Sequence, residues 1–236
     1  MSADLEAALG DVGESVVGAL FGVLTAVRGS RVFHPQGAAF AASFEPDAAP
    51  AGAAWRSWDL VRSGRARRAV VRLSRGAGLP QPLVDHLGIS VRIVDAYGRG
   101  RHQDLLLGAS HRAPLGRHLL LPARGFLSAW YSSVLPYRLG GDLVVVGAGA
   151  LSSDGDDDDP EQLALNGAMP IAFQLEAAQV FGAWQPFGRV TLRRRLADRT
   201  ADALRFNPFN TGGGLEPAGV VNRVRNPAYR SSQDAR

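Results

Sequence analysis

The stretch that decides the fold is "RRAVVRLSRG", residues 67–76. From Val71 onward apolar and polar residues alternate, and Gly76 ends the run. A period of two is typical of a β-strand with one buried face. Further strand-like stretches are separated by Gly, Pro and Asp turns. They lie at residues 31–46, 88–97, 102–110, 141–153, 169–178 and 188–196.

Helical patterns are fewer and lie at residues 3–27, 124–133 and 218–235. Strands are seldom followed by long helices, which argues against a parallel sheet built from βαβ units. We therefore expect an α+β fold, an antiparallel β-barrel of about eight strands with flanking helices. With no repeat and no long linker, residues 1–236 are expected to form one domain. Its expected parts are an N-terminal helix at 1–27, a barrel at 28–196 and a C-terminal segment with a helix at 197–236.

Composition restricts the chemistry. Hydrophobic residues make up 46% of the 236 residues, enough for a buried core. The chain has no Cys, which excludes disulfides, thiolate zinc sites and Cys nucleophiles. The net charge is +4, and all 26 basic residues are Arg. This surplus fits a carboxylate-bearing ligand, nucleic acid, or codon bias alone.

The N-terminal stretch argues against secretion. It has no basic n-region, and acidic residues precede the apolar run at 16–27. That run is too short to span a bilayer. We expect a cytoplasmic protein that does not associate with a membrane.

Two further patterns invite a metal or nucleotide reading. In "DLVVVGAGALSSDG", residues 142–155, a strand runs into a G-x-G motif, but a dinucleotide site needs a helix directly after it. The following "LSSDGDDDDP" would make a poor helix and would repel phosphate, so we interpret the motif as a strand that ends in a glycine turn. Four of the five histidines match no zinc-site spacing and are expected in loops or at the surface. They are His86, His102, His111 and His118.

Three segments carry a more specific signal. They are "RVFHPQGAAFAASFEP" at 31–46, "VRLSR" at 71–75, and "FNPFNTGGGLEP" at 206–217, which Arg225, Tyr229 and Arg236 follow. In order and internal spacing they resemble signatures of the catalase-like haem protein superfamily. The stretch "GFLSAWYSSVLPYR" is similar to one in small catalase-related peroxidases. The resemblance covers roughly residues 28–236.

The resemblance implies a haem b (iron protoporphyrin IX) cofactor. Tyr229 matches the tyrosine that binds the iron as a phenolate. Free tyrosine has a pKa of about 10, so ionisation needs help from the iron and from a nearby cation. On a helix that includes it, Arg225, four residues earlier, shares a face with Tyr229 and supplies that cation; if Pro227 starts the helix, Arg225 need not face Tyr229. Arg31, Arg72 and Arg236 match arginines that contact the haem propionates.

The resemblance also implies a catalytic pair. His34 matches the distal histidine, which takes a proton from bound peroxide and returns it to the leaving oxygen. Ser74 matches the serine that orients this histidine. The distal asparagine of the family is absent, and Ala109 or Ser110 stands in its place after "DLLLG". Efficient catalase activity is therefore not expected.

The predicted function is a haem peroxidase that reduces hydrogen peroxide or organic hydroperoxides with an external electron donor, as a monomer or homodimer. A close variant is isomerisation of a fatty-acid hydroperoxide. The alternatives are a haem carrier or sensor with little turnover, and a haem-free barrel for an apolar ligand. Arginines in residues 62–75 and 189–196 suggest nucleic acid instead, but no aromatic residues interleave with them as a stacking platform requires. We therefore expect no nucleic-acid partner.

Overall fold

The computed structural model describes residues 36–48, 52–76, 84–151 and 170–218. All of them belong to one compact unit spanning residues 34–218. The predicted helix at 3–27 and nearly all of the one at 218–235 lie outside the described residues. So do five predicted site residues: Arg31, His34, Arg225, Tyr229 and Arg236. The single-domain assignment stays a prediction.

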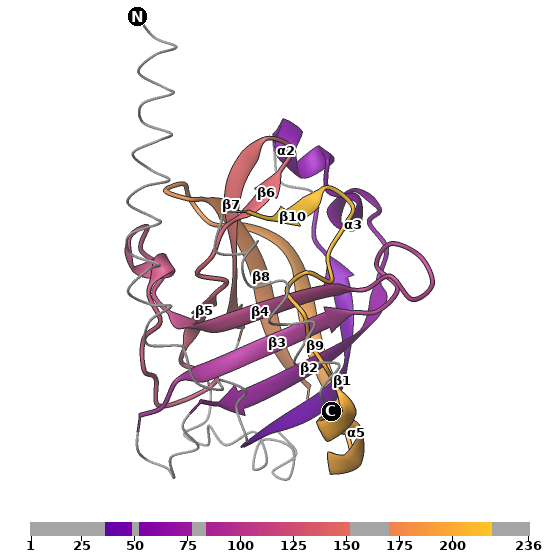
Figure 1. Ribbon diagram of the computed structural model, residues 1–236, viewed down its shortest axis with the longest axis vertical. Helices are drawn as coiled ribbons and strands as arrows, with labels where there is room; N and C mark the ends of the chain where they lie inside the picture. Colours follow the sequence, from indigo (N-terminus) through magenta and orange to yellow (C-terminus); the bar gives the residue numbers. More distant parts are fainter. Residues whose placement is uncertain (1–35, 49–51, 77–83, 152–169, 219–236) are drawn as a thin grey trace, which may run out of the picture. The chain divides into compact units, whose positions relative to one another are not determined.

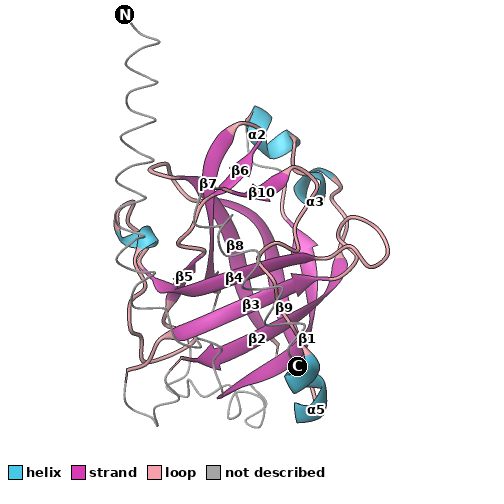
Figure 2. Cartoon of the chain, viewed as in Figure 1, coloured by secondary structure: helices cyan, strands magenta, loops and turns pink. Residues whose placement is uncertain are grey.

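A ten-stranded antiparallel sheet dominates the structure (Figures 1 and 2). Its strands are β1 (Gln36–Pro46), β2 (Arg67–Arg75), β3 (Leu87–Ile93), β4 (Gln103–Ser110), β5 (Trp130–Ser132), β6 (Tyr137–Leu139), β7 (Asp142–Ala150), β8 (Ile171–Gln179), β9 (Gln185–Arg195) and β10 (Leu215–Pro217). They are ordered β10-β6-β7-β5-β4-β3-β2-β1-β9-β8, and β7 also pairs with β8. This last pairing closes eight strands into a barrel, and β6 and β10 extend the sheet beside β7. The predicted antiparallel barrel is confirmed.

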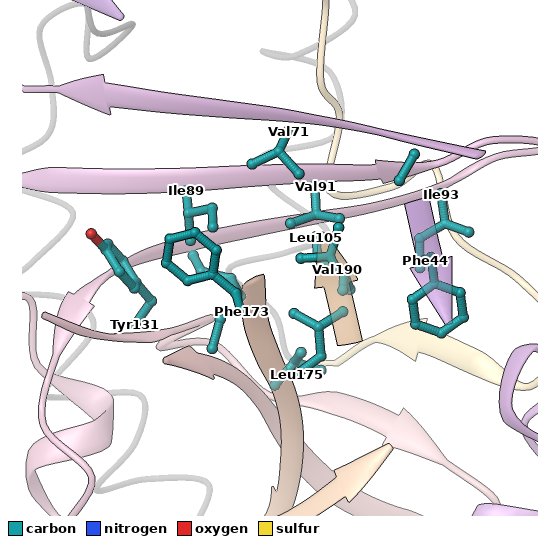
Figure 3. Close-up of a cluster of buried hydrophobic side chains, with 14 of the residues drawn as sticks. Phe44, Val71, Ile89, Val91, Ile93, Leu105, Tyr131, Phe173, Leu175 and Val190 are labelled. Atoms are coloured by element: carbon teal, nitrogen blue, oxygen red, sulfur yellow. The ribbon is translucent and has the colours of Figure 1, made fainter. Parts of the chain in front are cut away.

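Alternation along the strands fills the barrel interior. In β3, Leu87, Ile89, Val91 and Ile93 are buried in the core cluster, and the residues between them face outward. Large side chains from opposite walls meet inside (Figure 3). The labelled examples are Phe44, Val71, Ile89, Val91, Ile93, Leu105, Tyr131, Phe173, Leu175 and Val190.

Short helices join the strands. They are α2 (Ala53–Arg56), α3 (Asp59–Arg62), the 3-10 helix η1 (Gly116–His118) and α5 (Asp198–Ala203). Within the part of the chain that the structure describes, no helix is long and apolar enough to cross a membrane.

The predicted helix at 124–133 is wrong, because its aromatic residues pack as a strand. Tyr131 is fully buried in the core, and its hydroxyl donates to the Phe126 carbonyl at 2.9 Å. Trp130 points the other way and lies against the glycines of β7. Two adjacent aromatics on opposite sides of a sheet require the two-residue period of a strand.

The glycines in "VGAGA" also have a different role from the predicted turn. Gly147 and Gly149 lie inside β7 and pair with β5 and β8. A Cβ on Gly147 would stand 2.7 Å from Cζ2 of Trp130 and 2.9 Å from Cη2 of Trp184. These positions are therefore glycine because two indole rings lie on the strand.

Candidate functional site

Both predicted site residues that the structure describes, Arg72 and Ser74, lie on the outer face of the barrel. They alternate along β2 with Val71 and Leu73, which belong to the core. Strand register places them in rows that cross β1 to β4, which we call the outer rows. The rows are Gly37–Ser74–Gly88–Gly108, Ala39–Arg72–Ser90–Leu106 and Ala41–Val70–Arg92–Asp104.

The first two outer rows form a low, smooth surface. Apart from Arg72 and Leu106, every position in them is Gly, Ala or Ser. Gly37 has no space for a side chain, since a Cβ there would stand 2.5 Å from the Leu73 carbonyl oxygen. Small side chains let a packed group come close to the backbone of these strands, where Ala39 and Ser74 are already buried.

Arg72 is a half-buried cation at the centre of the second row. Burial, the largest cause, lowers the pKa of its guanidinium from the ordinary value. Asp202 acts in the opposite direction, and Arg205 lowers the pKa further. Asp202 is thus an anion that already stabilises the charged form of this half-buried guanidinium.

Ser74 is buried in the first row, and its hydroxyl donates to the Gly88 carbonyl at 3.4 Å. His34, which this serine is predicted to orient, lies outside the described residues. The orienting role of Ser74 therefore stays a prediction.

The two residues at the place where the resemblance expects an asparagine face opposite ways. Ala109 is 2% exposed and faces the core, whereas Ser110 faces outward. The Ser110 hydroxyl donates to the Gly116 carbonyl at 3.0 Å. Beside it, Leu120 covers Gly108, because a Cβ on that glycine would stand 2.4 Å from the Leu120 Cδ2. Neither Ala109 nor Ser110 supplies a side-chain amide at this end of the first row, and Leu120 adds apolar surface there.

The segment that follows β9 runs back along the outer rows (Figure 1). The Leu196 N–H donates to the Ala39 carbonyl at 2.7 Å, and the Asn207 N–H donates to the Asp104 carboxylate at 2.9 Å. The Phe206 ring lies 5.2 Å from the Arg92 guanidinium carbon. "FNPFN" and "VRLSR", recognised separately in the sequence, thus come together on one face.

Arg92 and Asp104 also belong to this face, although neither was predicted as a site residue from the sequence. The alternation of apolar and polar residues along the strands is the sequence signal that could have identified them. Arg92 in "SVRIV" and Asp104 in "QDLLL" are charged residues at outward positions of apolar strands, next to each other in the register. Their partner, Asn207, could not be found this way because it is more than a hundred residues away in a loop.

A second group of side chains lies on the outside of β5, β7 and β8. The Arg112 guanidinium stacks on Trp130, 4.0 Å from the ring centre, and binds Glu176 through two hydrogen bonds of 2.8 and 3.1 Å. Arg117 lies over Trp184, whose ring centre is 5.1 Å from that of Trp130. A cleft of about 340 Å³ runs alongside, lined by Ser110, His111, Arg112, Leu121, Ser128 and Trp130, among others. The charge of Arg112 is already balanced by Glu176, so this group packs the barrel wall.

His118 departs from the expectation of a loop or surface histidine. It is buried, with Nδ1 3.0 Å from the Val134 carbonyl oxygen and Nε2 3.3 Å from that of Val180. It ties η1 to two loops. Over the described ranges, no cluster of three or more His, Asp or Glu side chains could hold a metal ion.

Comparison with known proteins bears on the fold. A solved structure titled "Structure of a bacterial catalase" matches with a TM-score of 0.63 at 13% sequence identity. The match covers 92% of this chain and 60% of that one, so this chain spans less than two thirds of the catalase's length. No protein-family model matches the sequence, and no similar curated protein was found. The barrel is therefore a catalase-like fold.

Proposed function

We propose that this protein is a haem-dependent peroxidase with a catalase-like barrel. It reduces hydrogen peroxide or organic hydroperoxides with an external electron donor and has weak or no catalase activity. The observation that carries the proposal is the outer face itself. There Arg72 and Ser74 stand among small residues, and the segment beginning at Phe206 lies alongside.

The described residues fit haem b by shape and charge. Haem is flat and largely apolar and has two carboxylates at one edge, so it needs a smooth apolar surface with cations beside it. The outer rows offer Gly, Ala and Ser positions around Arg72. Arg72 supplies a half-buried cation among these positions, as a propionate contact would require.

The remaining roles fall on residues matched through the resemblance. Tyr229 is the iron ligand, and Arg225 stabilises its phenolate. Arg31, Arg72 and Arg236 hold the propionates. The bound iron supplies the redox chemistry that cleaves the O–O bond of a peroxide.

The proton transfer belongs to His34. Its imidazole accepts the proton of the peroxide and returns it to the departing oxygen. Ser74, two residues from Arg72 on the same face, holds the imidazole in position.

The proposal of weak catalase activity has support at the end of the first row. Neither Ala109 nor Ser110 carries a side-chain amide that could hold a second small peroxide; Ala109 faces the core, and the Ser110 hydroxyl is bound to the Gly116 carbonyl. Leu120 adds apolar surface there. Both features favour organic hydroperoxides over the disproportionation of hydrogen peroxide.

The test is the absorption spectrum of the protein loaded with haem, compared with that of Tyr229→Phe. We expect a Soret band with high-spin ferric features in the first and a lost or shifted band in the second. Peroxide-dependent oxidation of a reducing dye then measures turnover. If folded protein gives no Soret band after haem is added, the proposal is wrong, and a haem-free barrel for an apolar ligand replaces it.

The second candidate function is haem binding with little turnover, as in a carrier or sensor. It is favoured by the same missing amide at Ala109 and Ser110. A Soret band that depends on Tyr229, combined with dye oxidation no faster than that of free haem, would select this function.

A further inference from the structure

Arginines from two distant parts of the sequence meet on one side of the barrel. The arginine-rich stretches at residues 62–75 and 189–196 contribute β2 and β9, and these two strands flank β1 in the sheet (Figure 1). Apart from Arg72, none of these arginines has a role in the proposed function. Their gathering on neighbouring strands is therefore a separate feature of the molecule.

Strand register shows which of these arginines face outward. Ser43 of β1 pairs with Arg68 on β2, and Ala41 pairs with Arg194 on β9. Both β1 residues alternate with members of the core, so they and their partners face the outside of the barrel. Arg68 and Arg194 are exposed there.

A β-bulge in β9 brings a further arginine to the same side. The pairing with β1 shifts by one residue between Leu192 and Arg194, which leaves Arg193 as the extra residue. In a regular strand Arg193 and Arg194 would face opposite sides. Here both are exposed, and Arg193 donates to the Ser43 hydroxyl from Nε at 3.3 Å and from Nη2 at 3.2 Å. Bulges that re-aim a side chain are typical of functional positions.

We call the outward arginines of β2 and β9 beside β1 the arginine face. It consists of Arg68, Arg189, Arg193 and Arg194, and all four are exposed. Between them β1 presents the small side chains of Ala41 and Ser43. Neighbouring strands lie about 4.8 Å apart, so β2 and β9 lie about 10 Å apart across β1. Long side chains from both strands can reach a row of anions that runs along β1.

The charge of the arginine face is poorly balanced. The Glu45 carboxylate lies 3.8 Å from Arg193 Nη2, and both side chains are more than half exposed. The guanidinium groups of the other three, Arg68, Arg189 and Arg194, form no ion pair with any residue that the structure describes. Like charges held side by side repel one another, and a bound polyanion would remove this repulsion.

We propose that the arginine face binds the phosphate backbone of duplex DNA without reading its sequence. A basic protein whose arginines gather on one face has the electrostatic footprint of a nucleic-acid binder. Guanidinium groups bind phosphates through two parallel hydrogen bonds. One backbone of the duplex runs along β1, with arginines of β2 and β9 on its two sides. The proposal does not depend on haem.

Other polyanions fit this face less well. A single strand needs aromatic side chains for base stacking, and their lack is the reason to expect no such partner. A duplex keeps its bases stacked and is held through its phosphates. An anionic membrane binds basic surfaces that also insert apolar side chains. The large apolar side chains exposed within the described ranges all lie outside β1, β2 and β9: Val84, Leu115, Leu119, Leu121, Leu151 and Phe181.

Fluorescence anisotropy with a short labelled DNA duplex tests the proposal. Each phosphate contact contributes about −0.9 to the slope of log affinity against log salt concentration, so four arginines give about −3 to −4. The affinity should therefore fall about a hundredfold between about 50 and 200 mM salt. A duplex of unrelated sequence should bind equally well.

Single substitutions locate the binding. Arg68→Gln and Arg194→Gln should each weaken binding and reduce the steepness of the salt dependence by about 1. Arg194→Lys keeps the charge and should bind nearly as the wild type does. Arg138→Gln is the matched control, because Arg138 is exposed on β6, in another part of the sheet, and the net charge changes equally. Glu45→Gln removes the carboxylate of the face and should strengthen binding.

The outcomes decide between occupants of the arginine face. A steeper loss of DNA binding in Arg68→Gln and Arg194→Gln than in Arg138→Gln supports the proposal. Equal loss in all three would assign binding to net charge alone and overturn it. Binding of phosphatidylserine vesicles in place of DNA would assign the face to a membrane and also overturn it. So would DNA binding that appears only when the aspartates at 156–159 are changed to asparagine, because that acidic run would then be the occupant.

Discussion

At Tyr97, burial decides the ionisation behaviour of one side chain. Its hydroxyl accepts from Trp58 Nε1 at 3.0 Å and donates to Gln103 Oε1 at 2.7 Å. Burial, the largest cause, raises the pKa of Tyr97 far above its ordinary value of 10.0. The folded protein therefore resists ionisation of this residue more than the unfolded chain does.

The expected consequence is a loss of stability in alkali. Below about pH 10 both states keep the proton, and the contribution of Tyr97 is fully present. As the pH rises toward the folded pKa, only the unfolded chain ionises and the contribution is lost. The chain has no lysine, so its tyrosines dominate titration there. Urea midpoints at pH 9 and 11 should fall more for the wild type than for Tyr97→Phe, and equal falls would contradict this account.

Gly147 shows a packing constraint at a single residue. Gly147→Ala would place a methyl group against Trp130 and Trp184, and we expect a loss of about 1–3 kcal/mol in the free energy of unfolding. Chemical denaturation measures it. Trp184→Leu should relieve part of the cost, so the double variant should be less destabilised than the sum of the single ones. Additive effects would show that the Trp184 indole does not cause the loss of stability in Gly147→Ala.

At the scale of an element, the segment from Leu204 to β10 depends on glycine. Gly213 has φ of 60°, and a Cβ there would stand 2.3 Å from the Tyr97 ring. Its carbonyl accepts from the Asp59 N–H at 2.8 Å. The segment is thus pressed onto the barrel at a point where no side chain fits.

Gly213→Ala should therefore loosen this segment. We expect it to be less stable than Gly100→Ala by about 1–3 kcal/mol. Gly100 is the matched control, with φ of 76° and no atom near a Cβ, so it carries the backbone strain without the clash. Urea denaturation compares the two variants, and limited proteolysis should cut Gly213→Ala first between residues 204 and 217. Equal stabilities of the two variants would mean that the clash with Tyr97 contributes nothing and that only the backbone conformation matters.

The length of each strand decides whether the sequence could predict it. Strands β2, β3 and β4 alternate over seven to nine residues, and such a pattern is visible without a structure. β5, β6 and β10 have three residues each, too few for a period to appear. The stretch that contains β5 predicts a helix, because "FLSAW" also fits a helical spacing. Only the space beside Gly147 and Gly149 places Trp130 outside the barrel.

For the whole molecule, closure of the barrel gives the candidate site its geometry. The β7–β8 pairing joins the two ends of the strand order, so the outer rows have a fixed curvature and face. Motif spacing brought Arg72 and Ser74 into consideration. It could not show that Ala109 faces inward, or that Asp104 reaches Asn207, because both depend on register between distant strands.

The most direct test of the outer face as a haem site is a haem titration of Ser90→Trp. Ser90 lies between Arg72 and Leu106 in the second outer row, so an indole there would occupy the proposed haem surface. Ser43→Trp is the control. Ser43 lies on the outside of β1 beside Arg193, two positions beyond Ala41 of the third outer row and four beyond Ala39 of the second. We predict that Ser90→Trp weakens haem binding at least tenfold, about 1.4 kcal/mol, while Ser43→Trp binds as the wild type does. Equal haem affinity in all three folded proteins would contradict the account.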